Sequence, residues 1–281
     1  MTGLTVSIMG CGWLGIPLAE TLIKESTTIK GSTTREEKLP LLKEKGIEPY
    51  LISLSPEQMI GDLPSFLDTD IVIINIPPGR KSGSVEESYM AKIEEVARNI
   101  NQKRTKGIIF VSSTSVYGNI KGVVRENATP EPVTSSGKAL LRSERFIQSL
   151  SVPVSNLRLG GLIGPDRHPG RFFRRVSEVQ NGDAPVNLIG LEDVIGVILR
   201  IMKYEAWGET FHLASTEHPT KRAFYSYAIE AFGGHSPIFK EGGEDAKLID
   251  SSTSLQKLQY ELKHADLFEY VSGLSSKAGK M

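Results

Sequence analysis

Short apolar runs alternate with amphipathic stretches along the first 160 residues of the chain. The apolar, β-branched runs predict six strands, over residues 4–9, 27–33, 49–53, 70–76, 107–112 and 151–158. Several stretches between them carry apolar residues at helical spacing and predict helices, including 16–24, 84–102 and 136–150. Strands that alternate with helices are typical of a parallel α/β sheet, and we predict a doubly wound Rossmann fold.

The turn after the first predicted strand is rich in glycine. Gly10 would allow the tight turn, Gly12 would let the backbone approach a pyrophosphate, and Gly15 would let helix and strand pack closely. We therefore predict a dinucleotide site, and the alternative is an ordinary glycine-rich turn. The predicted cofactor-binding residues of this loop are Gly10, Cys11, Gly12, Trp13, Leu14 and Gly15.

The end of the second predicted strand indicates which dinucleotide binds. An acidic residue that binds a ribose 2′-hydroxyl is expected about 20 residues beyond the glycines. The sequence there reads Ser32-Thr33-Thr34-Arg35 instead, so we predict that Thr34 and Arg35 face the 2′-phosphate of NADP. Charge-assisted hydrogen bonds of about 1.5–3 kcal/mol would favour NADP over NAD by roughly ten- to a hundredfold. Glu36 and Glu37 keep NAD open, because either carboxylate could take the ribose if the turn is longer.

The fourth and fifth predicted strands end where ligands bind in a doubly wound sheet, at the carboxyl ends of the strands. The fourth strand ends in Pro77-Pro78-Gly79, which cannot continue a ladder, and we place Pro77 beside the cofactor. The fifth strand runs into a hydroxyl-rich segment, Ser112-Ser113-Thr114-Ser115, followed by Tyr117. This segment should face the same crevice.

Composition and charge exclude several classes of function. The 281 residues include 33 Lys and Arg against 33 Asp and Glu, so we expect neither nucleic acid nor an anionic membrane as partner. No apolar stretch reaches the roughly 20 residues of a membrane span, and the N-terminus shows no secretory signal. Cys11 is the single cysteine, which favours a reducing, cytoplasmic location. No histidines and acids have metal-ligand spacing, and we expect no metal.

Five further segments add to the glycine loop: VSSTSVYG (111–118), KALLRSE (138–144), RLGGLIGPDRHPGR (158–171), NLIGLEDVI (187–195) and GETFHLAS (208–215). Together they resemble the extended short-chain dehydrogenase/reductase superfamily, in its NAD-dependent epimerase/dehydratase branch. The glycine spacing and a missing tyrosine are similar to an atypical, YeeZ-like subgroup. The resemblance implies an NAD(P)-dependent epimerase, dehydratase or reductase for a small sugar-like or nucleotide-linked substrate. Relatives often pair as homodimers through the helices that correspond to 84–102 and 136–150, and the sequence leaves the oligomeric state open.

The resemblance also assigns catalytic roles. Ser113, four residues before Tyr117, matches the serine that binds the reacting oxygen in the family. Lys138 matches the lysine that lowers the pKa of the catalytic tyrosine and holds the nicotinamide ribose, although it could be an ordinary exposed helix lysine. Thr134 stands at the tyrosine position. An aliphatic hydroxyl cannot replace a phenol with a pKa of about 10, so another group supplies the proton or catalysis is crippled. Tyr117 is the nearest tyrosine, but this position usually packs in the family.

By the same resemblance, the chain leaves the sheet after residue 158 to begin a smaller substrate-binding lobe interleaved with the Rossmann domain. We predict a helix over residues 171–179 in this lobe, and a return to the sheet over 186–194 and 210–214. The predicted Rossmann domain comprises residues 1–158 plus about 185–215, and the smaller lobe comprises residues 159–184 plus 216–281.

A local cluster of positive charge lies at the start of the smaller lobe. Arg167 and Arg171 could bind an anionic substrate, such as the diphosphate of a nucleotide sugar. The alternative is a solvated helix face. His168 could cap or pack in its turn as well as act in chemistry. The cluster consists of Arg167, His168, Arg171, Arg174 and Arg175.

Three functional hypotheses follow from these patterns. The first is an NADP-dependent oxidoreductase or epimerase that uses Ser113 and Lys138 with an unidentified proton donor. The second, motivated by Thr134, is a non-catalytic NADP(H)-binding sensor or scaffold. The third is a β-hydroxyacid dehydrogenase, which IMGCGWLGIPLAE (8–20) with Arg35 also resembles. That class would need an all-helical second half, and the strand-like segments NLRLGGLIG and ETFHLA argue against it.

Overall fold

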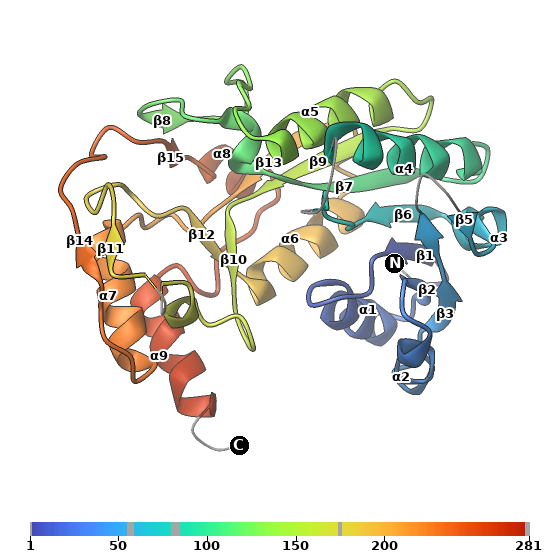
Figure 1. Ribbon diagram of the computed structural model, residues 1–281. Coiled ribbons are helices and arrows are strands. Elements are labelled where there is room, and N and C mark those ends of the chain that lie inside the picture. Colours follow the sequence, from blue (N-terminus) through green and yellow to red (C-terminus); the bar gives the residue numbers. More distant parts are fainter. Residues whose placement is uncertain (1, 55–58, 80–84, 174–175, 279–281) are drawn as a thin grey trace. The chain divides into compact units, whose positions relative to one another are not determined.

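The computed structural model describes residues 2–54, 59–79, 85–173 and 176–278 (Figure 1). The chain divides into two compact units that interleave along the sequence. Unit 1 contains Met1–Gly118, Pro132–Arg158 and Ile198–Phe211, and unit 2 contains Asn119–Glu131, Leu159–Val197 and His212–Met281.

A seven-stranded sheet carries the glycine loop. From edge to edge its strands are β13 (Thr210–Leu213), β9 (Val154–Leu159), β7 (Gly107–Ser113), β6 (Ile71–Ile74), β1 (Thr5–Met9), β2 (Thr28–Thr33) and β3 (Glu48–Leu51). The pairs from β3 across to β7 are parallel. The four residues of β6 are all buried, as expected of a central strand covered on both faces. The predicted doubly wound Rossmann sheet is confirmed.

The order of the strands reverses between β1 and β6. From β1 the chain builds outward through β2 to β3, then returns to β6 on the other side of β1 and continues to β7. Ligands of doubly wound sheets bind at such a switch point, at the carboxyl ends of the strands. Gly10 follows β1 there, and Asn75 follows β6.

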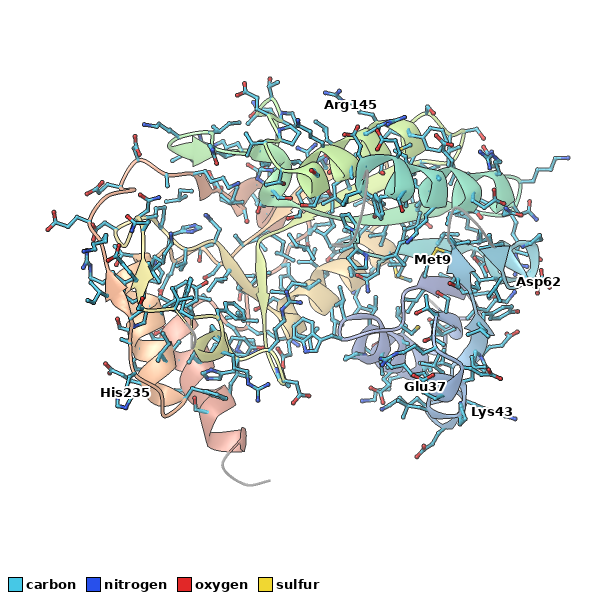
Figure 2. The ribbon with its side chains drawn as sticks, viewed as in Figure 1. Met9, Glu37, Lys43, Asp62, Arg145 and His235 are labelled. Atoms are coloured by element: carbon cyan, nitrogen blue, oxygen red, sulfur yellow. The ribbon has the colours of Figure 1, made fainter. Side chains whose placement is uncertain are left out.

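Helices cover both faces of the sheet in unit 1. Figure 1 shows α4 and α5 side by side on one face and α1 on the other. Met9, at the end of β1, is buried, whereas Glu37 lies at the surface (Figure 2). No helix of the described residues is long and apolar enough to span a membrane. The elements are α1 (Gly15–Lys24), η1 (Glu36–Lys38), α2 (Leu39–Glu44), α3 (Leu63–Leu67), α4 (Val85–Asn99), η2 (Thr114–Tyr117), α5 (Ser135–Ile147) and the antiparallel pair β4 (Ser53–Leu54) and β5 (Met59–Ile60).

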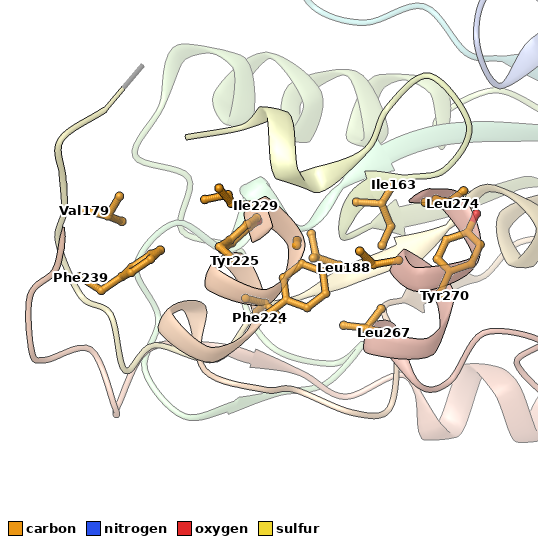
Figure 3. Packing of buried hydrophobic residues seen from close by; sticks show 13 residues of the cluster. Ile163, Val179, Leu188, Phe224, Tyr225, Ile229, Phe239, Leu267, Tyr270 and Leu274 are labelled. Carbon is orange, nitrogen blue, oxygen red and sulfur yellow. The ribbon is translucent and has the colours of Figure 1, made fainter. Parts of the chain in front are cut away.

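Unit 2 combines short parallel strand pairs with helices. The pairs are β10 (Gly161–Ile163) with β12 (Leu188–Gly190), β11 (Glu178–Val179) with β14 (Ile238–Phe239), and β15 (Leu248–Ile249) with β8 (Val123–Val124). The helices are η3 (Pro169–Arg171), α7 (Lys221–Ala231), α8 (Ser252–Lys257) and α9 (Leu267–Ala278), while α6 (Leu191–Lys203) spans the boundary between the units. An apolar core that includes Phe224, Leu188 and Leu267 joins α7, β12 and α9 (Figure 3).

The helix predicted over residues 171–179 is wrong for the described residues. The chain forms the short turn η3 and then β11, and Arg174 and Arg175 lie outside the described residues. The turn is tied to α7, because a Cβ on Gly170 would lie 2.3 Å from the Ala228 carbonyl oxygen. The ring of Phe173 also packs edge-on against Tyr225, with ring centroids 4.8 Å apart. These tertiary contacts override the local helical pattern.

The strand predicted over residues 186–194 does not return to the seven-stranded sheet. Only Leu188–Gly190 is extended, and this strand pairs with β10. Residues 185–197 therefore lie in unit 2, together with the residues 159–184 and 216–281 that we assigned to the smaller lobe. Ser84, the first residue of the helix predicted over 84–102, lies outside the described residues.

Candidate active site

The glycine loop after β1 has the backbone that its sequence predicts. Gly10 has a φ of +103°, and a Cβ there would lie 2.6 Å from the Asn75 carbonyl oxygen. A Cβ on Gly15 would lie 2.3 Å from the Gly10 carbonyl oxygen. No side chain can occupy either position without displacing backbone. The turn and the close packing of α1 on β1 therefore require glycine at both positions.

Gly12 differs from the other two glycines, because a Cβ there would meet nothing within 4 Å. The helix that follows, α1, begins without a side-chain cap and without an acidic residue in its first turn. The first amides of a helix lack intrahelical partners, and the helix dipole places positive charge at this end. Free space beside Gly12 and an uncapped helix N-terminus fit the pyrophosphate of a dinucleotide.

Cys11 and Leu14 are only 3% and 4% exposed, so their side chains are not available to a ligand and any contact would be made by backbone. Burial raises the pKa of Cys11 to about 12, and the thiol stays protonated at neutral pH. Trp13 is half-buried.

Two polar side chains that sequence reasoning missed hold the loop. The Gly10 amide donates to Ser32 Oγ over 3.0 Å, and the Cys11 amide donates to the Ser32 carbonyl over 2.8 Å. Asn75 Nδ2 donates to the Gly10 carbonyl over 3.2 Å. Their positions at the ends of the second and fourth predicted strands are the only signal that the sequence offers.

The segment after β2 presents both candidates for the ribose. The Arg35 side chain is 58% exposed and pairs loosely with Glu37, with 3.7 Å between Nε and Oε1. The Arg35 amide donates to Thr33 Oγ1 over 3.2 Å, and Thr34 is exposed. Glu37 also remains at the surface, in η1. The geometry is therefore compatible with both an arginine contact to NADP and a carboxylate contact to NAD.

Ser113 lies where β7 ends and caps the turn η2. Its Oγ accepts a hydrogen bond from the Ser115 amide over 3.1 Å. A hydroxyl has one donor and two acceptor sites, so this bond leaves its proton for donation to another oxygen. The preceding residue, Ser112, is 5% exposed, and its Oγ has no hydrogen-bond partner among the described residues.

Thr134, which the resemblance places at the tyrosine position, is the N-cap of α5. Its Oγ1 accepts from the Gly137 amide over 3.1 Å and lies 3.3 Å from Ser136 Oγ. Lys138 is exposed in the first turn of the same helix. The turn packs on η2, because a Cβ on Gly137 would lie 2.8 Å from the Ser115 carbonyl oxygen. The threonine therefore has a helix-capping role in the structure.

Tyr117 is fully buried in a charged network that sequence reasoning did not predict. Its hydroxyl accepts a hydrogen bond of 2.5 Å from Arg158, whose guanidinium lies 5.0 Å from the tyrosine ring centroid. Arg158 also pairs with Glu144 on α5, over 2.6 Å between Nη2 and Oε2. The arginine between two leucines in the strand VSNLRL was the available signal. Full burial and the contact with Arg158 give Tyr117 a packing role in the structure.

Pro77 is exposed, and the segment that carries it is anchored from α4. The hydroxyl of Tyr89 donates to the Ile76 carbonyl over 2.8 Å. Burial raises the pKa of Tyr89, so its hydroxyl remains a donor in this bond.

The substrate candidates Arg167 and Arg171 are exposed residues of unit 2. The Arg171 guanidinium lies 5.1 Å from the Phe232 ring centroid. His168, in contrast, caps and packs: its Nδ1 accepts from the Gly170 amide over 3.1 Å, and its ring stacks on Phe232. Burial, assisted by the nearby Arg171, lowers the pKa of His168. The histidine therefore has a structural role at η3.

Comparison with known proteins places the chain in a family. No family model matches it. The protein YeeZ of Escherichia coli strain K12 is 36% identical over 266 residues, which cover 93% of this chain and 96% of YeeZ. The chain belongs to the YeeZ family. A second relative of this YeeZ-family chain is YtcB of Bacillus subtilis strain 168, described as an uncharacterized UDP-glucose epimerase, with 25% identity over 284 residues, 89% of this chain and 90% of YtcB.

Solved epimerases share the fold of this YeeZ-family chain. UDP-glucuronic acid 4-epimerase from Bacillus cereus, solved in complex with NAD, has a TM-score of 0.81 and 17% identity and covers 99% of each chain. UDP-glucose 4-epimerase from Thermotoga maritima, solved with UDP-glucose, has a TM-score of 0.81 and 18% identity over 99% of each chain. The predicted resemblance to the epimerase branch of the extended short-chain dehydrogenases is confirmed.

Proposed function

We propose that this YeeZ-family chain is an NADP-dependent enzyme of the epimerase, dehydratase or reductase type, and that its substrate is a nucleotide-linked sugar. The free space at Gly12, next to the uncapped N-terminus of α1, carries the proposal. Support for the substrate class comes from the description of YtcB as a UDP-glucose epimerase and from the UDP-sugar epimerases that share the fold.

In this proposal the residues of unit 1 bind the cofactor. The backbone of residues 10–15 and the first turn of α1 receive the pyrophosphate, and Thr34 and Arg35 contact the 2′-phosphate. Pro77 lines the site, and Lys138 holds the nicotinamide ribose. The bound nicotinamide would supply hydride chemistry at the sugar.

The substrate side of the proposal rests on Ser113 and on unit 2. Ser113 donates its free hydroxyl proton to the reacting sugar oxygen. Arg167 and Arg171 pair with the diphosphate, and residues 159–184 and 216–281 form the substrate lobe. Thr134 caps α5 and Tyr117 is fully buried, so in this proposal the proton donor is a different group. We also propose a homodimer through α4 and α5, which lie side by side and match the helices for which the resemblance suggested pairing.

The first test compares NADPH with NADH by titration, followed through protein fluorescence. We expect NADPH to bind about ten- to a hundredfold more tightly than NADH, because Arg35 pairs with the 2′-phosphate. The Arg35→Ala variant should lose this preference, whereas Arg98→Ala, which removes another exposed arginine, should keep it. Preference for NADH would indicate that Glu36 or Glu37 binds the ribose 2′-hydroxyl. Binding of neither nucleotide would end the enzyme proposal.

A second test adds one methyl group at Gly12. The Gly12→Ala variant should fold with unchanged stability, because its Cβ meets no protein atom within 4 Å. It should bind NADPH about ten- to a hundredfold more weakly, since the methyl occupies the space of the pyrophosphate. Gly273→Ala, which is equally open but lies in α9, is the matched control and should bind normally. Normal NADPH binding by Gly12→Ala would show that the pyrophosphate does not bind beside Gly12.

The capping role of Thr134 favours a second candidate function, a non-catalytic NADP(H) sensor or scaffold. This alternative predicts tight NADPH binding with no conversion of any sugar nucleotide in a broad panel. Conversion of a single physiological compound would reject it. The β-hydroxyacid dehydrogenase hypothesis required an all-helical second half, and the strand pairs of unit 2 contradict it.

A further inference from the structure

We infer that Ser32 and Asn75 are positioning residues that hold the glycine loop in the shape that receives the cofactor pyrophosphate, an inference that rests on the proposed function. Ser32 lies near the end of β2 and Asn75 lies directly after β6, and these two strands flank β1. Neither residue needs to touch the cofactor. Both act through the peptide groups of the loop.

Their hydrogen bonds fix both polar groups of Gly10. Its amide donates to Ser32 Oγ over 3.0 Å, and its carbonyl accepts from Asn75 Nδ2 over 3.2 Å. The backbone of the same two residues adds two further hydrogen bonds. The Ser32 carbonyl accepts from the Cys11 amide over 2.8 Å, and the Asn75 amide donates to the Met9 carbonyl over 2.9 Å. Residues 9–11 are therefore bound from both neighbouring strands.

These hydrogen bonds restrict the backbone of Gly10, which as a glycine would otherwise be flexible. Gly10 adopts a φ of +103°, in a region that only glycine readily enters, and glycine has the largest conformational freedom to lose. A loop that is ordered before the cofactor arrives avoids the cost of ordering it upon binding. Because Ser32 is 4% exposed and its hydroxyl is directed at the loop, discrimination at the ribose falls to Thr34 and Arg35.

The test compares two ligands that differ in the pyrophosphate. NADPH contains it, whereas 2′-AMP carries only the adenosine and the 2′-phosphate. We expect Ser32→Ala and Asn75→Ala each to weaken NADPH about threefold to tenfold, the effect of one lost hydrogen bond. Their affinity for 2′-AMP should stay within about twofold of wild type, because Arg35 is unchanged. Amide hydrogen exchange at Gly10 and Cys11 should become faster in Ser32→Ala.

Three further variants make the result specific. Asn75→Asp keeps the side-chain size but replaces the donor by a second acceptor, and it should bind NADPH as weakly as Asn75→Ala. Ser32→Thr keeps the hydroxyl and should restore most of the affinity. Ser112→Ala removes a buried hydroxyl that has no described partner and should bind both ligands normally. Equal losses for NADPH and 2′-AMP, or no loss for NADPH, would overturn the inference, whereas a wild-type protein that binds neither ligand would overturn the proposed function itself.

Discussion

Replacement of Glu144 by alanine is expected to lower the free energy of unfolding by about 3–5 kcal/mol, the usual cost of removing one partner of a buried ion pair. The side chains of Glu144 and Arg158 are 1% and 8% exposed. Without the carboxylate, the guanidinium of Arg158 remains buried with only the neutral hydroxyl of Tyr117 as a described side-chain partner. The measurement is urea unfolding of wild type and variant, followed by circular dichroism.

Two controls separate the buried pair from a general effect of charge removal. Glu95 pairs with Arg98 over 2.6 Å at the surface of α4, and Glu95→Ala should cost less than about 1 kcal/mol. The double replacement Glu144→Leu with Arg158→Met should recover much of the lost stability, because it leaves no unpaired charge. A loss in Glu144→Ala no larger than in Glu95→Ala would contradict the interpretation.

Replacement of Ser113 by alanine is expected to reduce turnover by about 10²–10³-fold, the typical effect of losing one donor to the reacting oxygen. NADPH affinity should change by less than about twofold, because Ser113 is proposed to contact the sugar and not the cofactor. The assay measures conversion of UDP-glucose and UDP-glucuronic acid by the NADP-loaded protein. Turnover is compared on whichever sugar nucleotide the wild type converts.

The neighbouring serine provides the matched control for this variant. Ser112→Ala removes a hydroxyl from the same strand and should keep wild-type turnover, because Ser112 Oγ bonds to no described residue. Ser113→Ala also removes the cap bond to the Ser115 amide, so unfolding must be measured beside turnover. Ser113→Thr retains a hydroxyl and should restore part of the activity. Full activity of Ser113→Ala would remove this serine from the mechanism.

Local patterns in the sequence were sufficient for the main sheet and for the glycine loop. The strands of the sheet are runs such as Ile71–Ile74, whose composition alone favours burial between two layers of helices. The loop was predictable from the spacing of its glycines. A Cβ on Gly10 would lie 2.6 Å from the Asn75 carbonyl oxygen and one on Gly15 2.3 Å from the Gly10 carbonyl oxygen, which leaves no room for any other residue type. The arginine at position 35, where an acid is expected, and the threonine at position 134 could also be read directly from the sequence.

Long-range contacts decided the remainder. Ser32 and Asn75 lie 22 and 65 residues from Gly10, and no local pattern indicates that both bind its peptide. Distant serines also bind the backbone at the end of β13. The amides of His212 and Ala214 donate to the hydroxyls of Ser254 and Ser251. The helix predicted over residues 171–179 does not form in the described residues, because this segment packs on α7.

The sequence by itself determined the sheet, the turn geometry of the loop and the family of this protein, because these depend on residue type at short spacing. Only the tertiary structure decided that Thr134 caps a helix, that Tyr117 is committed to the Glu144–Arg158 pair, and that Gly10 is held from two strands. The reason is physical. A buried polar group must find its hydrogen-bond partner wherever the fold brings one within reach, and sequence distance does not limit that choice.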